Sequence, residues 1–192
     1  MESVVVTSPA DVVAEGKLVL LRRKRLDDAR LDWIWRTDVE LAELDAATVS
    51  PLTYEQYRNQ YAWQLRSTPV YRSTFAVETI DEPRHIGNVM YYNTDFQRRE
   101  TELGILLGDR TCWNGGFGRE AVGLLVDHIF TNTSLTRVYL HTLDWNVRAQ
   151  RAFSAAGFRD CGRVRRATHR FHQMHVLREW FWDRQYQRRS AP

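Results

Sequence analysis

The sequence between residues 101 and 143 most limits the possible fold, because it predicts a strand, a helix and a second strand in succession. Residues 101–107 end in three consecutive apolar side chains, which is typical of a central strand buried on both faces. Over residues 121–130 apolar side chains recur at helical spacing and form a wide stripe. Residues 137–143 have the pattern of the next strand. We therefore expect a β-α-β unit, with a glycine-rich turn at residues 113–118 between its first strand and its helix.

The flanking sequence supplies further elements on both sides of this unit. Apolar runs bounded by turn residues predict strands over residues 17–22, 74–80, 86–92, 159–164 and 173–181. Helices are expected from residue 26, after the capping-box pattern of residues 53–56, and over residues 146–156 before Gly157. The resulting order, β-α-α-β-β-β-α-β-α-β-β, predicts a mixed α/β fold in which helices flank a mainly antiparallel central sheet.

The bulk composition is that of one globular domain. The chain has 192 residues, of which 43% are hydrophobic and 27% charged, so residues 1–192 are expected to form a single domain. Its two cysteines, Cys112 and Cys161, lack metal-ligand spacing and make no disulfide framework, which favours a reduced, cytoplasmic setting without a metal site. No run approaches the roughly 18 apolar residues of a membrane span, and residues 1–16 lack the pattern of a signal peptide.

The segment Trp113-Asn114-Gly115-Gly116-Phe117-Gly118 is suited to binding phosphate. A helix N-terminus offers unpaired backbone N–H groups and the positive end of the helix dipole, and glycines let an anion approach that backbone closely. Arg119 adds a cation beside the loop. A Walker loop is excluded because no Gly-Lys-Ser/Thr sequence ends the segment, and a Rossmann loop would follow the first strand rather than the fourth.

Three stretches in the second half together resemble the GNAT acetyltransferase superfamily: residues 102–109, residues 113–121 and residues 146–158. Trp113, Gly116 and Gly118 match the loop pattern of that superfamily. Within it, the chain is similar to the RimJ/RimL-type branch, which acetylates protein N-termini, polyamines and small amines. The resemblance extends over residues 17–182. It implies an N-acetyltransferase that uses acetyl-CoA as co-substrate, with a sheet that splays at the acetyl-CoA site.

The resemblance also implies roles for particular residues. The backbone of Ile105 and Leu107 would bind the pantetheine arm, which inserts like an extra strand, and the N–H near Ile105 would polarise the thioester carbonyl. Asn146 would hold a pantetheine amide, act as a plain helix N-cap, or do both. The residues expected to contact acetyl-CoA are Ile105, Leu107, Trp113, Asn114, Gly115, Gly116, Phe117, Gly118, Arg119, Asn146 and Phe153.

Two residues depart from the family pattern. Asn114 stands where the family usually has glycine, and asparagine tolerates the left-handed conformation better than most residues. Phe153 stands where the family often has a tyrosine that protonates the departing thiolate. Because a thiol has a pKa of about 8.5, its thiolate is a tolerable leaving group, so either solvent or Tyr139 supplies the proton or none is needed.

The implied reaction is direct attack of an amine on acetyl-CoA, without an enzyme nucleophile. An alkylamine has a pKa of about 10, so a carboxylate or a histidine has to take its proton, often through water. Glu102 is the main candidate for this general base, because it lies on the strand that carries the thioester. The alternative is that Glu102 is an ordinary ion-paired carboxylate. His141 and Asp144 are the second candidates, and Glu100 ranks below them because it is expected in a charged turn.

The acceptor is expected to be a primary amine, either a protein N-terminus, a polyamine or another small amine. Five aromatic side chains of the first two predicted helices are candidates to line its groove: Trp33, Trp35, Tyr54, Tyr57 and Trp63. A homodimer is the expectation taken from the family. The sequence alone does not select one acceptor.

Two other functions stay open from the sequence alone. A non-catalytic acyl-CoA-binding or sensing module on the same fold would account for Phe153. A nucleic-acid-binding domain would account for the arginines between residues 163 and 170. That second alternative lacks interleaved aromatic residues and leaves the glycine loop without a role, so neither nucleic acid nor a membrane is an expected partner.

Overall fold

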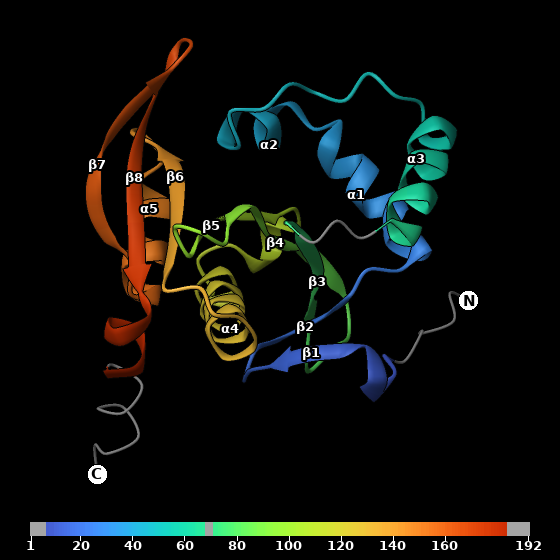
Figure 1. Cartoon of the computed structure of the whole chain (residues 1–192). Helices are drawn as coiled ribbons and strands as arrows, with labels where there is room; N and C mark the ends of the chain where they lie inside the picture. Colours follow the sequence, from blue (N-terminus) through green and yellow to red (C-terminus); the bar gives the residue numbers. More distant parts are fainter. Residues whose placement is uncertain (1–6, 68–70, 184–192) are drawn as a thin grey trace.

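The computed structural model describes residues 7–67 and 71–183, which form one eight-stranded sheet covered by helices (Figure 1). Across the sheet the strands follow the order β1-β2-β3-β4-β5-β6-β8-β7, and all neighbours are antiparallel except β5 and β6. This arrangement confirms the expected fold class. The strands are β1 (Val12–Glu15), β2 (Val19–Arg23), β3 (Ser73–Thr79), β4 (His85–Asp95), β5 (Glu100–Leu107), β6 (Arg137–Leu143), β7 (Arg159–Arg166) and β8 (His169–Leu177).

Helices lie on both sides of the middle strands. Figure 1 shows α4 below these strands, and α1, α2 and α3 above them. Within the described ranges, no helix is long and apolar enough to cross a bilayer. The α-helices are α1 (Ala29–Arg36), α2 (Val39–Leu44), α3 (Tyr54–Arg66), α4 (Phe117–Asn132) and α5 (Val147–Ala156), and residues 178–183 are also helical.

Helix ends follow the signals in the sequence. The predicted capping box opens α3, where the Gln56 N–H donates to the Thr53 hydroxyl and the Thr53 N–H donates to Gln56 Oε1 at 3.0 Å. Gly157 ends α5 with φ at 111°, a left-handed conformation that costs glycine little. Local chemistry therefore sets these two boundaries.

Two short elements, β1 and α2, are not predicted by the sequence, and the final strand is predicted in the wrong place. It occupies His169–Leu177 instead of residues 173–181. Arg178 ends it, because its backbone N–H donates to the Thr136 carbonyl at 2.9 Å and its Nε donates to the Leu135 carbonyl at 2.8 Å. These contacts turn the chain out of the sheet, and residues 178–183 continue as a helix.

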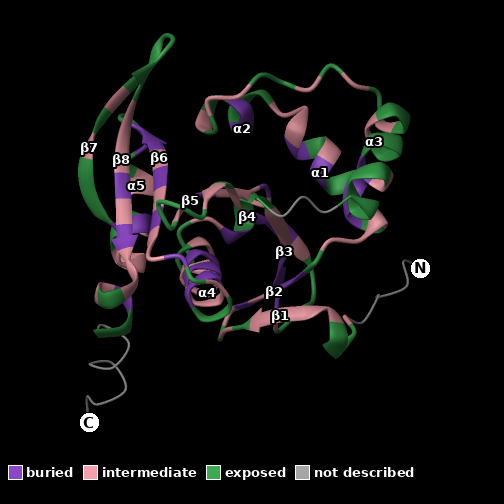
Figure 2. Ribbon diagram, in the orientation of Figure 1, coloured by how far each residue is buried: buried purple, intermediate pink, exposed green. Residues whose placement is uncertain are grey.

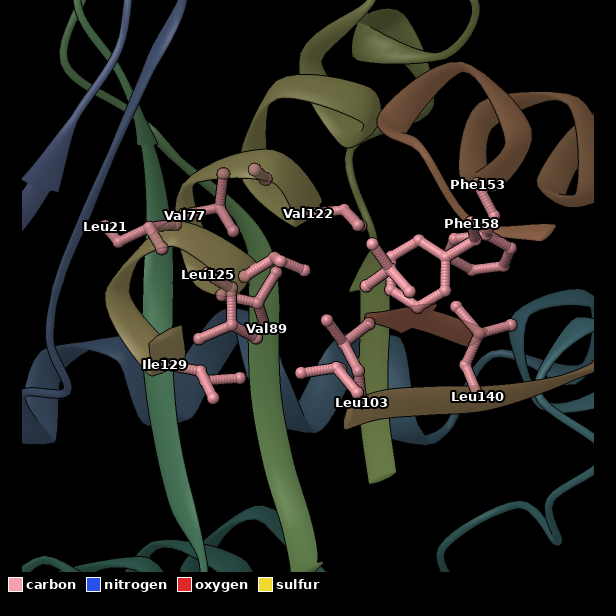
Figure 3. Packing of buried hydrophobic residues seen from close by; sticks show 14 of the residues in the cluster. Leu21, Val77, Val89, Leu103, Val122, Leu125, Ile129, Leu140, Phe153 and Phe158 are labelled. Carbon is pink, nitrogen blue, oxygen red and sulfur yellow. The ribbon is translucent and has the colours of Figure 1, made fainter. Parts of the chain in front are cut away.

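The hydrophobic core lies between the sheet and α4. The stripe predicted over residues 121–130 is buried, and Figure 3 shows its side chains against those of the sheet. Each fully buried aliphatic side chain of this kind contributes roughly 1.5–3 kcal/mol. Labelled core residues in Figure 3 are Leu21, Val77, Val89, Leu103, Val122, Leu125, Ile129, Leu140, Phe153 and Phe158. Figure 2 shows that burial is concentrated here, whereas β7 and the tip of the β7–β8 hairpin are exposed.

Helix α1 packs on a buried polar network. Leu31, Ile34 and Trp35 recur at helical spacing in the sequence, but of these three only Trp35 is buried, and Leu31 and Ile34 are exposed. The helix instead turns Asp32 inward, where Lys24 Nζ lies 2.8 Å from its carboxylate. The Lys24–Asp32 ion pair, whose two side chains are nearly inaccessible to solvent, therefore takes the place of the apolar contact that the spacing suggests for this helix.

The same network joins the start of α1 to the sheet. Arg22 binds Asp28 with two nitrogens, at 2.8 and 2.9 Å, and its Nε donates to Glu78 at 2.6 Å. Burial acts to raise the pKa of Asp28, but the hydrogen bond from Arg22 and nearby positive charge outweigh it and lower that pKa to about 2. Removing one partner would leave a buried charge unpaired, so these residues fix the position of α1 on β2 and β3.

Glu120, in the first turn of α4, anchors the turn between β1 and β2. Its carboxylate accepts hydrogen bonds from the backbone N–H groups of Lys17, Leu18 and Val19, at 3.0, 2.6 and 2.9 Å. A Cβ on Gly16 would lie 2.6 Å from the Glu120 side chain, so only glycine fits at that position without displacement. The sheet edge and the N-terminus of α4 are thereby joined.

The substitution Glu120→Ala should destabilise the fold by about 2–3 kcal/mol, because it leaves several partly buried N–H groups without an acceptor. Urea denaturation followed by circular dichroism measures the effect. Glu55→Ala provides the matched control, since Glu55 also lies in the first turn of a helix but is exposed. Equal unfolding midpoints for the two variants would contradict an anchoring role for Glu120.

Candidate active site

The sheet divides where its two parallel strands meet. Strands β5 and β6 pair over three residue pairs only, the last of which is Glu102 with Tyr139. Beyond this point β5 stays paired with β4 as far as Leu107, and β6 stays paired with β8 as far as Leu143. The facing edges of β5 and β6 therefore diverge, which is the splay expected from the sequence.

Backbone groups on the open edge of β5 face the gap. The Gly108 N–H donates to the Ile86 carbonyl at 3.0 Å, toward the β4 side. Because antiparallel pairing alternates along a strand, the N–H and C=O groups of Leu103, Ile105 and Leu107 point the other way. The Leu107 carbonyl accepts the indole N–H of Trp113 at 2.9 Å. Unpaired backbone groups need a partner when they are removed from water, so this edge is suited to an extended polar ligand.

A cavity of about 960 Å³ occupies the gap. It runs from the glycine loop, past the open edge of β5, to the β7–β8 hairpin and the end of α2. Of the eleven residues expected to contact acetyl-CoA, ten line it: Ile105, Leu107, Trp113, Asn114, Gly115, Gly116, Gly118, Arg119, Asn146 and Phe153. Phe117 is not part of the lining; its ring packs beneath Gly115 instead.

The loop at one end of the cavity has the conformation that close backbone approach requires. Asn114 has φ at 63° and Gly116 has φ at 89°, so Asn114 adopts the left-handed conformation expected of the glycine it replaces. A Cβ on Gly115 would lie 2.8 Å from the Phe117 ring, and a Cβ on Gly118 would lie 3.0 Å from Leu107. Because these glycines have no Cβ, the start of α4 packs closely against β5, and the N-terminus of α4 stays open to the cavity.

Cations and one amide surround this end. The Arg148 guanidinium lies 3.6 Å from the centre of the Trp113 ring, and Arg110 lies 5.5 Å from it. Asn146 is the N-cap of α5, with Oδ1 accepting the Ala149 N–H at 3.1 Å. Its Nδ2 has no hydrogen-bond partner among the described residues, so the capping role leaves a donor for the cavity.

Glu102 and His141 form a buried pair at the fork. Glu102 Oε1 lies 2.6 Å from His141 Nδ1, and the two side chains are 5% and 6% exposed. Asn93 Nδ2 donates to the other carboxylate oxygen at 3.0 Å. Burial acts to raise the pKa of Glu102, but hydrogen bonds from His141 and Asn93, with the nearby charge of Arg166, lower it below its usual value. The carboxylate is therefore ionised at neutral pH and holds the imidazole in place.

This arrangement agrees with the comparison to protein families. The model of the acetyltransferase (GNAT) domain matches residues 19–159 of the chain. The chain belongs to the GNAT acetyltransferase family. A curated relative, the uncharacterised protein MJ1062 of Methanocaldococcus jannaschii, is 24% identical to it over 149 residues. That match covers 77% of this chain but 29% of the relative, so the chain spans less than a third of the relative's length.

Solved structures share the fold of this GNAT domain. The spermidine N-acetyltransferase from Vibrio cholerae, in complex with CoA and spermine, has a TM-score of 0.74 at 18% identity, covering 85% of this chain and 98% of that one. A GNAT-family acetyltransferase from Bacillus anthracis has a TM-score of 0.73 at 18% identity, and the match covers 86% of this chain and 98% of that one. The aminoglycoside acetyltransferase AAC(6')-Ib in complex with coenzyme A has a TM-score of 0.69 at 20% identity, and the match covers 87% of this chain and 99% of that one. At such identities the likeness shows the fold alone.

The other proposed catalytic residues of this GNAT domain lie outside the cavity. Glu100 begins β5, where the sequence predicts a charged turn, and pairs with Arg137 at 2.5 Å. Asp144 is exposed and does not line the cavity. Tyr139 does not line it either, whereas Tyr92 does, and the Tyr92 ring lies against Gly104. Burial raises the pKa of Tyr92, and the negative charge of the nearby Glu102 raises it further, so the Tyr92 hydroxyl stays protonated.

Sequence reasoning missed part of the acceptor end. None of the five aromatic candidates of α1 and α3 lines the cavity, and Trp35 is buried against Gly108. The outer walls come instead from α2 and the β7–β8 hairpin. They include Leu41, Leu44, Asp45, Arg166, His169 and Phe171. The arginine-rich stretch 163–170 was the available signal for these residues, but it does not show which arginine faces inward.

Replacing His141 with phenylalanine should raise the pKa of Glu102. The variant loses a hydrogen bond that lowers this pKa, while burial, which raises it, is kept. Carbon-detected NMR titration of the Glu102 carboxyl in both proteins measures this. Since the folded-state pKa of wild-type Glu102 is depressed, its contribution to stability is present above the unfolded pKa, about 4.3, and is lost as pH falls through the folded value. An unchanged or lower pKa in the variant would refute this account of the pair.

Proposed function

We propose that this GNAT domain transfers an acetyl group from acetyl-CoA to a primary amine. One observation carries the proposal: the open edge of β5 leads without interruption from an anion-binding helix N-terminus to the buried Glu102–His141 pair. A phosphate-bearing, amide-bearing thioester has the length and polarity for such a groove. The amine then enters from the far end, between α2 and the β7–β8 hairpin.

The lining residues fit acetyl-CoA from end to end. Phosphates suit the loop at residues 114–118 and the N-terminus of α4, with Arg119, Arg148 and Arg151 as cations. Amide groups of the pantetheine arm suit the backbone N–H and C=O of Ile105, the N–H of Leu107 and the Nδ2 of Asn146; the Leu107 carbonyl already accepts the Trp113 indole N–H. The N–H groups on this edge are fixed in place, which lets them polarise a thioester carbonyl without reorganisation.

The reaction needs a proton acceptor but no enzyme nucleophile. The neutral amine nitrogen attacks the thioester carbon, a C–N bond forms, and the C–S bond breaks to release the thiolate of CoA. The proton lost from nitrogen passes to the Glu102–His141 pair, directly or through water. A proton for the sulfur comes from solvent or from the Tyr92 hydroxyl, because Phe153 is an apolar core residue.

The buried pair also favours an enzyme over a non-catalytic acyl-CoA sensor. Both Glu102 and His141 line the cavity, and a sensor of the thioester has no use for a proton acceptor there. Assignment to the RimJ/RimL-type branch, with its protein N-terminal and polyamine acceptors, is supported by the sequence motifs only.

A Gly116→Glu variant should bind CoA at least tenfold more weakly, because it places bulk and negative charge where the phosphates are expected and forces a non-glycine residue to φ of 89°. Isothermal titration calorimetry with CoA measures the change. Gly123→Glu is the matched control: it makes the same substitution in α4, where an added Cβ meets nothing within 4 Å. Equal CoA affinity in the two variants would refute the placement of the phosphates.

A Glu102→Gln variant should lower kcat by about 10²–10⁴-fold while leaving CoA affinity nearly unchanged, since the base acts on the amine. Release of free thiol is followed with an amine panel that includes a peptide N-terminus, spermidine and simple alkylamines. Unchanged turnover in the variant would remove Glu102 from the base role. Tight CoA binding by the wild type without thiol release from any amine would instead indicate the sensor.

A further inference from the structure

The far end of the cavity holds an arginine close to the Glu102–His141 pair, although amines are cations themselves. Among the lining residues that the structure describes, the acidic ones are Glu102 and Asp45. Asp45 is paired with Arg36 at 3.4 Å, and burial raises its pKa. Facing them across the cavity are Arg166 and His169 of the β7–β8 hairpin. A molecule with several positive charges would therefore meet a like charge, Arg166, beside the proposed base.

The hairpin concentrates like charge at its tip, because Asp160 pairs with Arg163 at 2.7 Å and with His172 at 2.9 Å but not with the residues between them. Between residues 163 and 172 the sequence has four arginines and two histidines but no aspartate or glutamate. Arg165 lies directly opposite Arg170, and Arg166 lies opposite His169. Like charges in directly opposed positions destabilise a hairpin, so these pairs lower the stability of the tip. Binding an anion there would offset that repulsion.

Alternation along the hairpin separates its charges into two sets. Phe171, His169 and Arg166 line the cavity, so they share the inner face. Arg165 and Arg170 occupy the alternate positions and therefore the outer face. Arg166 is thus the arginine of this hairpin that reaches the reacting groups.

Arg166 lies close to the proposed base. Its NH2 is 3.3 Å from both ring nitrogens of His141, and its NH1 is 4.0 Å from Glu102 Oε1. Its side chain is 54% exposed, and within the described residues no carboxylate lies nearer to it than this one. Its planar fork of donors therefore stays available to a carboxylate from outside. An anion bound to Arg166 on its cavity side would lie close to the Glu102–His141 pair.

We propose that the acceptor is an α-amino acid with an apolar side chain. Its amine would face the Glu102–His141 pair, and its carboxylate would bind Arg166. The two groups are joined by a single carbon, which matches the short distance from Arg166 to the base. Leu41, Leu44 and Phe171 line the same end of the cavity and suit an apolar side chain. This inference rests on the proposed acetyl transfer and names its substrate class.

Binding of the carboxylate would also affect the base. Arg166 is one of the charges that hold the pKa of Glu102 down. A carboxylate on Arg166 would offset this charge and make Glu102 a stronger proton acceptor when the substrate is in place. A simple amine would leave Arg166 uncompensated, and its own positive charge would be repelled on approach.

The test compares leucine with leucinamide, isopentylamine and spermidine as acceptors, using purified protein, acetyl-CoA and detection of free thiol. We expect kcat/KM for leucine to exceed that for leucinamide and isopentylamine by about tenfold or more, because a charge-assisted pair is lost in the other two. Spermidine should be the poorest of the four. A wild-type preference for spermidine or for either analogue that lacks the carboxylate would overturn the proposal.

Variants of the hairpin assign the preference to one residue. Arg166→Gln should bring the ratio of leucine to leucinamide to within about twofold of one, mainly through a higher KM for leucine, and Arg166→Lys should restore part of it. Arg165→Gln is the matched control on the outer face and should keep the wild-type ratio. A ratio that survives in Arg166→Gln would refute the role of Arg166.

The experiment separates the two levels of inference. Thiol release with any amine, without the expected preference, sinks the amino acid assignment and leaves the acetyltransferase standing. CoA binding without thiol release from any of the four acceptors or from a peptide N-terminus sinks both.

Discussion

The separation of β5 from β6 is the constraint on which the proposed site depends. Each strand keeps its other neighbour, so the sheet does not fray; only the two facing edges lose their partners. Backbone N–H and C=O groups on those edges are thereby left for a ligand, which is an unusual condition inside a sheet. Glu102 occupies the last paired position before the strands part, so the fork places a carboxylate where the backbone becomes free.

Other contacts hold the walls of the cavity against this fork. Glu120 ties the first turn of α4 to the β1–β2 turn, which fixes the glycine loop. The buried pairs around Asp28 and Asp32 fix α1 on the sheet, and α2 follows it in the chain. Arg110, just before the loop, binds Asp38 at 2.9 Å and Glu40 at 2.7 Å in α2. This last contact is partly exposed and is worth less than the buried ones, so α2 is the more loosely held wall.

The donor half of the site was predictable from sequence because it depends on local backbone chemistry. Glycines before a helix, an apolar strand and an N-cap asparagine are all visible as short patterns, and even the conformation of Asn114 follows from residue type. The acceptor half depends on register. His141 meets Glu102 only because Glu102 pairs with Tyr139 in a parallel ladder, and the inward turn of Arg166 depends on β8 beginning at His169, four residues earlier than the apolar pattern suggests. Helix α1 was predicted, but its buried face was not apparent from the apolar spacing, because that face is ionic.

The same division between the donor half and the acceptor half of the site explains why proteins that share this fold need not share an acceptor substrate. In the proposed function, acetyl-CoA is bound through backbone groups at a strand edge and a helix terminus, which depend little on side-chain identity. An acceptor is selected by a few side chains on the hairpin and on α2, which are free to change while the sheet is kept. Here those side chains place a guanidinium within 4.0 Å of the carboxylate base. A polycation would have to displace or oppose that charge, whereas a carboxylate beside the reacting amine is attracted by it. Under the proposal, the charge at this one position is therefore what makes an amino acid a better acceptor for this domain than a polyamine.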